Sequence, residues 1–261
     1  MKANYHTHTA RCQHAEGTDE AYVRAGLEAG YELLGFADHA PWPFPAGYRS
    51  RIRMSCDELP GYTMSLKTLQ RQYDGQIRIR IGLEAEYWPR YADALPRLME
   101  QGIEYLILGH HFNDSEEDTP YNGGQACLDD SGALRYAETI VRAMQTGLFV
   151  CVAHPDLFLK RRMDYTPACE AASDMICQAA LELHMPLEYN LLGLNIRMHG
   201  GTCGYPSGPF WQRAAHYGNT VIVGVDAHSP AQLLDREVMR AGMEHLRSLG
   251  IQPIECLPED A

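Results

Sequence analysis

The chain alternates short apolar runs with longer segments that have the spacing of amphipathic helices. Seven such runs occur, at residues 3–5, 33–36, 77–81, 105–108, 149–152, 185–187 and 221–225. Continuous apolar runs separated by helical segments are typical of βα units, whose parallel strands are buried on both faces. The pattern therefore predicts an α/β fold with seven parallel strands.

Start and stop signals support helices between these runs. Thr18 is an expected N-cap for a helix over residues 19–29, with Gly30 just beyond it. Thr166 and Ser229 each precede a proline, which is favoured in the first turn of a helix. Residues 40–56, 112–129 and 193–208 are predicted to be loops at one end of the strands.

Length and composition are those of one globular domain. The chain has 261 residues, of which 45% are hydrophobic, and no internal repeat or linker divides residues 1–261. The net charge of −12, without a Lys/Arg cluster, argues against binding to nucleic acid. The sequence contains neither a membrane-spanning apolar stretch nor a secretory signal, so a cytoplasmic protein without a membrane partner is expected. Its eight cysteines form no CxxC pair and are expected to be reduced.

Polar residues at the ends of the first and last runs form two pairs with a spacing of two. His6 and His8 follow the first run, and Asp226 and His228 follow the last. In an extended chain, residues i and i+2 point to the same face. Closure of a parallel barrel makes the first and last strands neighbours, so the two pairs are expected to converge on one site.

Further candidate metal ligands follow other runs: His39, Glu84, His111 and His154. Imidazole and carboxylate ligands without thiolate suit Zn, Mn or Fe, and their number exceeds the capacity of one tetrahedral ion. The residues alone leave His110 open as an alternative to His111, and Glu86 as an alternative to Glu84. The sequence contains no phosphatase loop with Cys and Arg six positions apart and no GxSxG motif, so metal-activated water is the expected nucleophile.

In combination, these motifs resemble the polymerase and histidinol phosphatase (PHP) superfamily, and within it the monofunctional histidinol-phosphate phosphatases. The stretches that carry the resemblance are residues 6–8, 12–14, 36–41, 82–87, 109–112, 153–157, 188–190 and 226–230. The resemblance implies a distorted TIM-like (β/α)7 barrel. It also implies three divalent metal ions, of Zn, Mn or Fe.

Residue roles follow from the same resemblance. It implies that His6, His8, Glu84 and Asp226 hold a first metal ion, and that Glu84 bridges to a second. His111 and His154 would complete the second site, and His14, His39 and His228 would hold the third. Glu84, Asp226 and His228 are the expected catalytic residues. The family pattern favours Glu84 over Glu86, and His111 over His110.

The implied reaction is hydrolysis of a phosphate monoester by a metal-bridging hydroxide, with L-histidinol phosphate as the expected substrate. Arg197 resembles a family arginine that clamps the phosphate, and Arg161 and Arg162 are further candidates for that role. The acidic segment 113–118 is a candidate partner for the cationic end of the substrate. The alternatives are a PHP-type phosphoesterase that acts on nucleotides or another small phosphorylated metabolite, and a non-catalytic metal-binding regulatory module.

Overall fold

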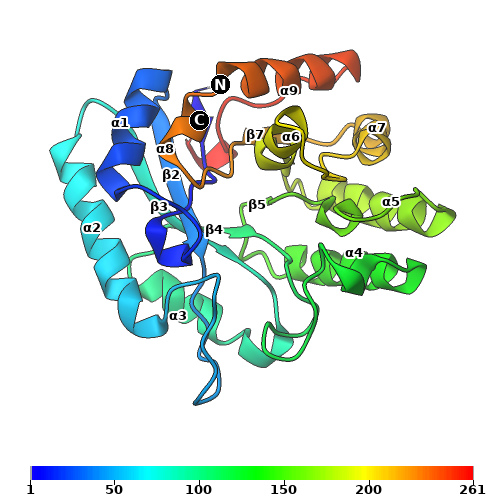
Figure 1. The fold of residues 1–261 in the computed structure, drawn as a ribbon, viewed down its shortest axis with the longest axis horizontal. Coiled ribbons are helices and arrows are strands. Elements are labelled where there is room, and N and C mark those ends of the chain that lie inside the picture. Colours follow the sequence, from blue (N-terminus) through cyan, green and yellow to red (C-terminus); the bar gives the residue numbers. More distant parts are fainter. Residues whose placement is uncertain (1, 261) are drawn as a thin grey trace.

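The computed structural model describes residues 2–260 and contains one sheet of seven strands (Figure 1). Each strand pairs in parallel with the next strand in the sequence. The strands are β1 (Ala3–Asn4), β2 (Leu33–His39), β3 (Arg78–Ala85), β4 (Tyr105–Leu108), β5 (Cys151–Val152), β6 (Leu187–Asn190) and β7 (Val221–Gly224). This arrangement confirms the predicted distorted (β/α)7 barrel.

The barrel closes beyond the carboxyl ends of β1 and β7. Thr7 and Ala227 form a parallel bridge there, with the His8 amide donating to the Ala227 carbonyl at 2.9 Å. At the opposite end of β7, the Val221 carbonyl accepts a hydrogen bond from the Ile254 amide at 2.8 Å. At this end of β7 the hydrogen bond comes from the carboxy-terminal segment and not from β1. Close to β1, the Tyr5 hydroxyl donates to Asp260 at 2.8 Å, so this segment also contacts the first strand region.

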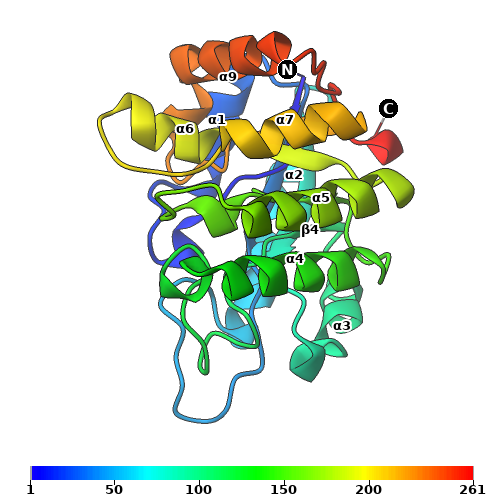
Figure 2. The ribbon, with the colours of Figure 1, turned by 90° about the vertical axis from the view of Figure 1, so that its right-hand side faces the viewer.

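Helices cover the outside of the sheet (Figures 1 and 2). They are α1 (Asp19–Ala29), α2 (Leu59–Gln72), α3 (Ala94–Glu100), α4 (Asp130–Met144), α5 (Pro167–Glu182), α6 (Leu191–Met198), α7 (Gly208–Tyr217), α8 (Pro230–Leu233) and α9 (Arg236–Ser248). The predicted caps form, because Thr18 accepts from the Ala21 amide and Thr166 from the Cys169 amide. Across residues 2–260, none of these helices has the length and apolar character needed to span a bilayer, and all eight cysteines are free.

The strands extend beyond the apolar runs that predicted them. β3 runs to Ala85, so Glu84 lies inside the strand, whereas the apolar run ends at residue 81. β2 likewise includes His39 as its last residue. His39 and Glu84 are partners in the β2–β3 ladder. Their backbones, and with them the starting points of their side chains, are therefore held by the hydrogen bonds of the sheet.

A small apolar cluster fills the inside of the barrel below the strand ends. Its central member is Tyr105, whose hydroxyl donates to the carbonyls of Tyr5 and Phe36 at 2.8 and 3.0 Å. Gly35 and Gly82 make room for this ring, since a Cβ at either position would overlap it. The barrel is therefore packed below its mouth.

We expect Gly82→Ala to lower the free energy of unfolding by about 2–3 kcal/mol, because the added methyl group overlaps the Tyr105 ring. Gly61→Ala is the matched control, since its Cβ meets nothing within 4 Å and it lies within α2. That variant should be more stable than wild type by about 0.5–1 kcal/mol. Urea denaturation measures both values, and equal stability of the two variants would contradict this account of the barrel interior.

Candidate active site

A cavity of about 470 Å³ opens at the carboxyl ends of the strands. Eight of the nine predicted metal ligands line it: His8, His14, His39, Glu84, His111, His154, Asp226 and His228. The ninth, His6, is fully buried with its Nε2 atom 3.1 Å from that of His8. The other lining residues are Ile52, Phe112, Tyr121, Leu157, Lys160, Leu192 and Tyr205. All three predicted mouth loops lie at or next to this cavity.

Glu84 lies at the centre of the ligands. Its Oε1 atom is 2.7 Å from His154 Nε2 and 3.2 Å from His111 Nε2. Its Oε2 atom is turned to the other side of the site, at 3.0 Å from His39 Nδ1. A carboxylate with its two oxygens directed at different groups of imidazoles has the geometry required to bridge two cations.

His6, His8 and Asp226 form a compact group beside Glu84 Oε2. The Nε2 atoms of the two histidines lie 3.3 and 3.2 Å from Asp226 Oδ1, and each lies 3.6 Å from Glu84 Oε2. Zinc–ligand bonds of about 2.0–2.1 Å in a tetrahedron place neighbouring ligand atoms about 3.3 Å apart. The four donor atoms therefore have the spacing of a metal site.

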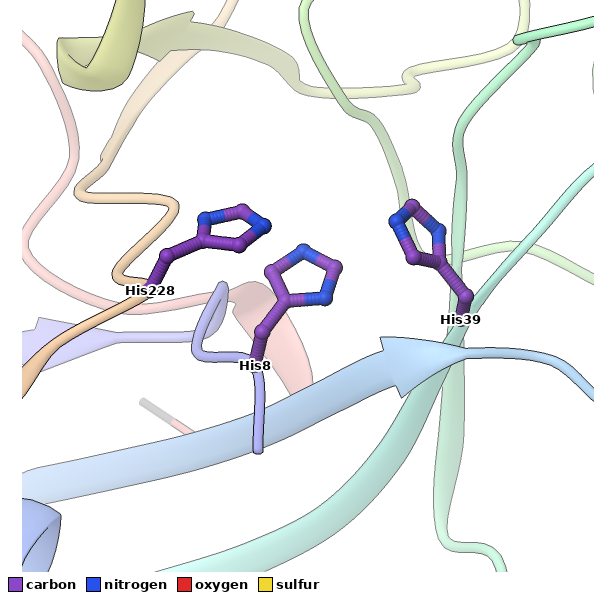
Figure 3. Close-up of side chains that lie close together, drawn as sticks. All are labelled: His8, His39 and His228. Carbon is purple, nitrogen blue, oxygen red and sulfur yellow. The ribbon is translucent and has the colours of Figure 1, made fainter. Parts of the chain in front are cut away.

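A further group of imidazoles lies at the outer side of the cavity. His14 Nε2 and His228 Nε2 are 3.1 Å apart. Ligand atoms of His8, His39 and His228 lie within 4.8 Å of one another, and Figure 3 shows that these rings come from three different segments. His39 also faces Glu84, so this group is continuous with the other two.

Acceptors outside the cavity orient several of the rings. Nδ1 of His6 faces Glu188 at 2.8 Å, Nδ1 of His14 faces the Cys12 carbonyl at 2.6 Å, and Nδ1 of His228 faces the Asp226 carbonyl at 3.0 Å. An Nδ1–H donated to such an acceptor leaves the Nε2 lone pair available for a cation. The three rings are thus oriented as metal ligands.

One oxygen of each carboxylate in the site is buried without a hydrogen-bond partner in the described part of the chain. Glu84 Oε2 and Asp226 Oδ1 are buried with no hydrogen-bond partner among residues 2–260. Burial raises the pKa of a carboxyl group, but the surrounding imidazoles outweigh burial and hold the pKa of Glu84 and of Asp226 well below the ordinary values. Buried carboxylate oxygens without a hydrogen-bond donor, placed among imidazole nitrogens, fit divalent cations.

Two of the predicted metal ligands, Asp226 and His154, have strained backbones. Asp226 has φ of 54° and His154 has φ of 29°, in the left-handed region that side chains other than glycine rarely adopt. Strain of this kind persists where the surrounding structure enforces it, and it is concentrated at functional sites. Here it directs both side chains into the mouth of the barrel.

The structure distinguishes between the alternatives at positions 86 and 110. Both oxygens of Glu86 accept hydrogen bonds from buried neighbours, Arg53 and Trp42 among them, and Glu86 does not line the cavity. The His110 ring packs 5.3 Å from the Tyr136 ring, and burial lowers the pKa of His110 to about 3. Glu84 and His111 are therefore the residues that face the centre of the site.

The three predicted phosphate-binding arginines do not line the cavity. Arg197, on α6, donates to the carbonyls of Cys203 and Pro206 and lines a separate hollow with Tyr189. Arg162 binds Asp130 and the Asp129 carbonyl. Arg161 is exposed. Arg197 and Arg162 are held by polar partners outside the cavity, which motif spacing does not reveal.

Lys160 is the Lys/Arg side chain that lines the cavity, and sequence reasoning missed it. Its ammonium lies 3.4 Å from the Tyr121 hydroxyl, and 5.2 and 5.9 Å from the Tyr121 and Tyr205 ring centres. The available signal was its position, directly before Arg161 in the loop that follows His154. The lysine supplies a positive charge beside the imidazoles.

The acidic segment 113–118, a candidate partner for the cationic end of the substrate, directs three of its carboxylates to contacts within the protein. Glu116 binds Arg53, Glu117 accepts from Tyr91, and Asp118 pairs with Arg90. No residue of this segment lines the cavity. These carboxylates instead fasten the loop to its neighbours.

The parallel barrel and its cluster of imidazoles and carboxylates define a class: a TIM-like barrel with a candidate metal site at the mouth. The model of the PHP domain family matches residues 4–191. The chain belongs to the PHP domain family.

Curated relatives are similar over different lengths. A protein named as a probable histidinol-phosphatase from Deinococcus radiodurans is 29% identical over 87% of this chain and 86% of its own. The histidinol-phosphatase of Bacillus subtilis is 30% identical over 43% of this chain and 44% of its own.

A solved structure has the same fold. The histidinol phosphate phosphatase of Lactococcus lactis, crystallised with zinc, L-histidinol and phosphate, superposes with a TM-score of 0.73 at 16% identity. The match covers 98% of this chain and 96% of that one.

We expect Glu84→Gln to retain less bound metal than wild type and to lose turnover by about a hundredfold or more. The reason is that the substitution removes the negative charge of the carboxylate at the centre of the imidazoles. Elemental analysis and a phosphatase assay measure the two effects. Glu28→Gln, an exposed position on α1, is the matched control and should behave as wild type. Full metal content in Glu84→Gln would contradict its central position.

Proposed function

We propose that this chain, as a single domain spanning residues 1–261, is a metal-dependent phosphoric monoester hydrolase that converts L-histidinol phosphate to L-histidinol and phosphate. The observation that carries the proposal is Glu84, buried between two groups of imidazoles in a cavity of a size suited to a small metabolite. The curated relatives named as histidinol-phosphatases support the choice of substrate.

The donor groups fit three divalent ions of Zn, Mn or Fe. His6, His8, Glu84 and Asp226 would hold the first, and Glu84, His111 and His154 the second. His14, His39 and His228 would hold the third. Zinc in the Lactococcus lactis structure supports this metal among the candidates. When bound, such ions lower the pKa of water and stabilise negative charge on a phosphoryl group.

Other residues of the cavity suit the two ends of the substrate. The Lys160 ammonium is available to a phosphate oxygen at the rim of the metal site. Ile52, Phe112 and Leu192 supply an apolar wall for the imidazole-bearing end. Neither end of such a substrate requires a basic groove of the kind that binds a nucleic-acid strand. A small phosphorylated metabolite, rather than nucleic acid or a membrane surface, is therefore the proposed partner.

Reconstituted protein should contain two to three equivalents of Zn, Mn or Fe and hydrolyse histidinol phosphate. Elemental analysis gives the metal content. A screen of histidinol phosphate, nucleoside monophosphates, sugar phosphates and a phosphodiester gives kcat/KM for each, with chelator-treated protein as the control. One equivalent or fewer after metal repletion would contradict the trinuclear site. A kcat/KM no higher for histidinol phosphate than for nucleotides would move the assignment to the alternative phosphoesterase.

We expect Lys160→Met to raise KM for histidinol phosphate by about 10–100-fold, because a charge-assisted hydrogen bond contributes about 1.5–3 kcal/mol. Steady-state kinetics at saturating metal measure the change. Lys67→Met, exposed on α2, is the control and should leave KM unchanged. An unchanged KM in Lys160→Met, together with a raised KM in Arg197→Met, would restore the arginine predicted from the sequence.

A further inference from the structure

A buried ion cluster lies behind the metal ligands and joins two mouth loops to β3. Its centre is Arg53, from the loop of residues 40–56, whose side chain is fully buried. The guanidinium binds both oxygens of Glu86, at 2.8 and 3.0 Å, just beyond the end of β3. Its Nε atom donates to Glu116, in the loop of residues 112–129, at 2.7 Å. Figures 1 and 2 show these two loops side by side at the mouth of the barrel.

One carboxylate of this cluster also contacts a predicted metal ligand. Glu86 Oε1, which does not line the cavity, lies 3.1 Å from Nδ1 of His111. Nε2 of the same ring lies 3.2 Å from Glu84 Oε1. Donation of the Nδ1 hydrogen to Glu86 fixes the tautomer in which the Nε2 lone pair faces the centre of the site.

The remaining contacts of Glu86 hold it in one position. Its Oε2 atom accepts from Trp42 Nε1 at 3.0 Å as well as from Arg53, so both oxygens are fully engaged. Burial disfavours the charge on Glu86, but the Arg53 guanidinium outweighs burial and holds the pKa of Glu86 well below its ordinary value. The carboxylate is therefore a fixed acceptor in a dry environment.

We propose that Glu86 is a positioning residue for His111 and that Arg53 holds Glu86 in place while joining it to the two mouth loops. This inference rests on the proposed metal site. Ile52 precedes Arg53, and Phe112 follows His111, and both line the cavity. The same buried cluster therefore sets the orientation of a ligand and the position of the apolar wall.

The test compares metal retention in Glu86→Gln and wild type, both loaded with zinc, during titration with a chelator. The amide keeps the size of the side chain but loses the charged acceptor. We expect Glu86→Gln to release its first equivalent of zinc at about 10–100-fold lower chelator concentration, the usual effect of removing a partner of a ligating histidine. At saturating zinc, kcat should fall while KM for histidinol phosphate stays within about twofold of wild type.

Glu116→Gln is the matched control, because it weakens the same ion cluster without touching His111. We expect it to lower Tm but to leave the chelator midpoint at the wild-type value. Trp42→Phe removes one donor to Glu86 without changing its charge, and should shift the midpoint in the same direction by a few-fold. It provides the measurement if Glu86→Gln does not fold.

Two outcomes would overturn the inference while leaving the proposed function intact. The first is a wild-type midpoint in folded Glu86→Gln, or in Trp42→Phe if Glu86→Gln does not fold. The second is an equal shift in Glu116→Gln, which would assign the effect to loop anchoring alone. A wild-type protein that retains no zinc would overturn the proposed metal site and this inference with it.

Discussion

The burial of the Glu84 carboxylate among imidazoles is the constraint on which the rest of the site depends. Five imidazoles have a nitrogen within 3.6 Å of its oxygens, and its side chain is 1% exposed. A charged carboxylate in such an environment is strongly destabilised unless cations or hydrogen-bond donors compensate it. The outward-facing nitrogens of several rings already have acceptors, so the inner nitrogens remain for cations. The arrangement makes structural sense as a binding site for metal ions.

Closure of the barrel brings together candidate ligands that are more than 200 residues apart in the sequence. β1 contains only two residues, and the bridge that joins it to β7 forms beyond both strands, between Thr7 and Ala227. That bridge lies between His6 and His8 on one side, and between Asp226 and His228 on the other. Backbone hydrogen bonds therefore fix the first group of ligands directly. The strained backbone at Asp226 belongs to the same junction.

The site divides into a part carried by strand ends and a part carried by loops. The proposed metal ligands lie on strands or within a few residues of a strand end, with His14 as the exception in a short segment after β1. Most of the cavity wall comes from loops. These are held by side-chain contacts such as the Arg53 cluster and by backbone bonds such as that from Gly204 to Lys160. Strands are rigid, so they can hold the donor atoms of a metal site within about half an ångström of their required positions. Loops vary more readily in sequence, so they can change which substrate the cavity accepts.

Local pattern determined the strands and the helix caps, and it brought out most of the candidate ligands. Apolar runs have the period of buried strands, and the spacing of His6 with His8 and of Asp226 with His228 follows from strand geometry. The sequence also offered both Glu84 and Glu86, and both His110 and His111, and only a family resemblance chose between them. In the structure, neighbours far away in the chain separate each pair: Arg53 and Trp42 engage Glu86, and Tyr136 packs against His110.

Tertiary structure alone decided which charged side chains reach the cavity. Arg197 and Lys160 are equally plausible cations in the sequence, but Arg197 turns to the carbonyls of Cys203 and Pro206, whereas Lys160 lies over the rings of Tyr121 and Tyr205. The bond of the carboxy-terminal segment to β7 was equally hidden from the sequence. The positions of long flexible side chains and irregular segments leave no hydrophobic periodicity in the sequence from which they could be predicted. Their positions are set by whichever distant polar partners the fold leaves available, and only the folded chain defines those partners.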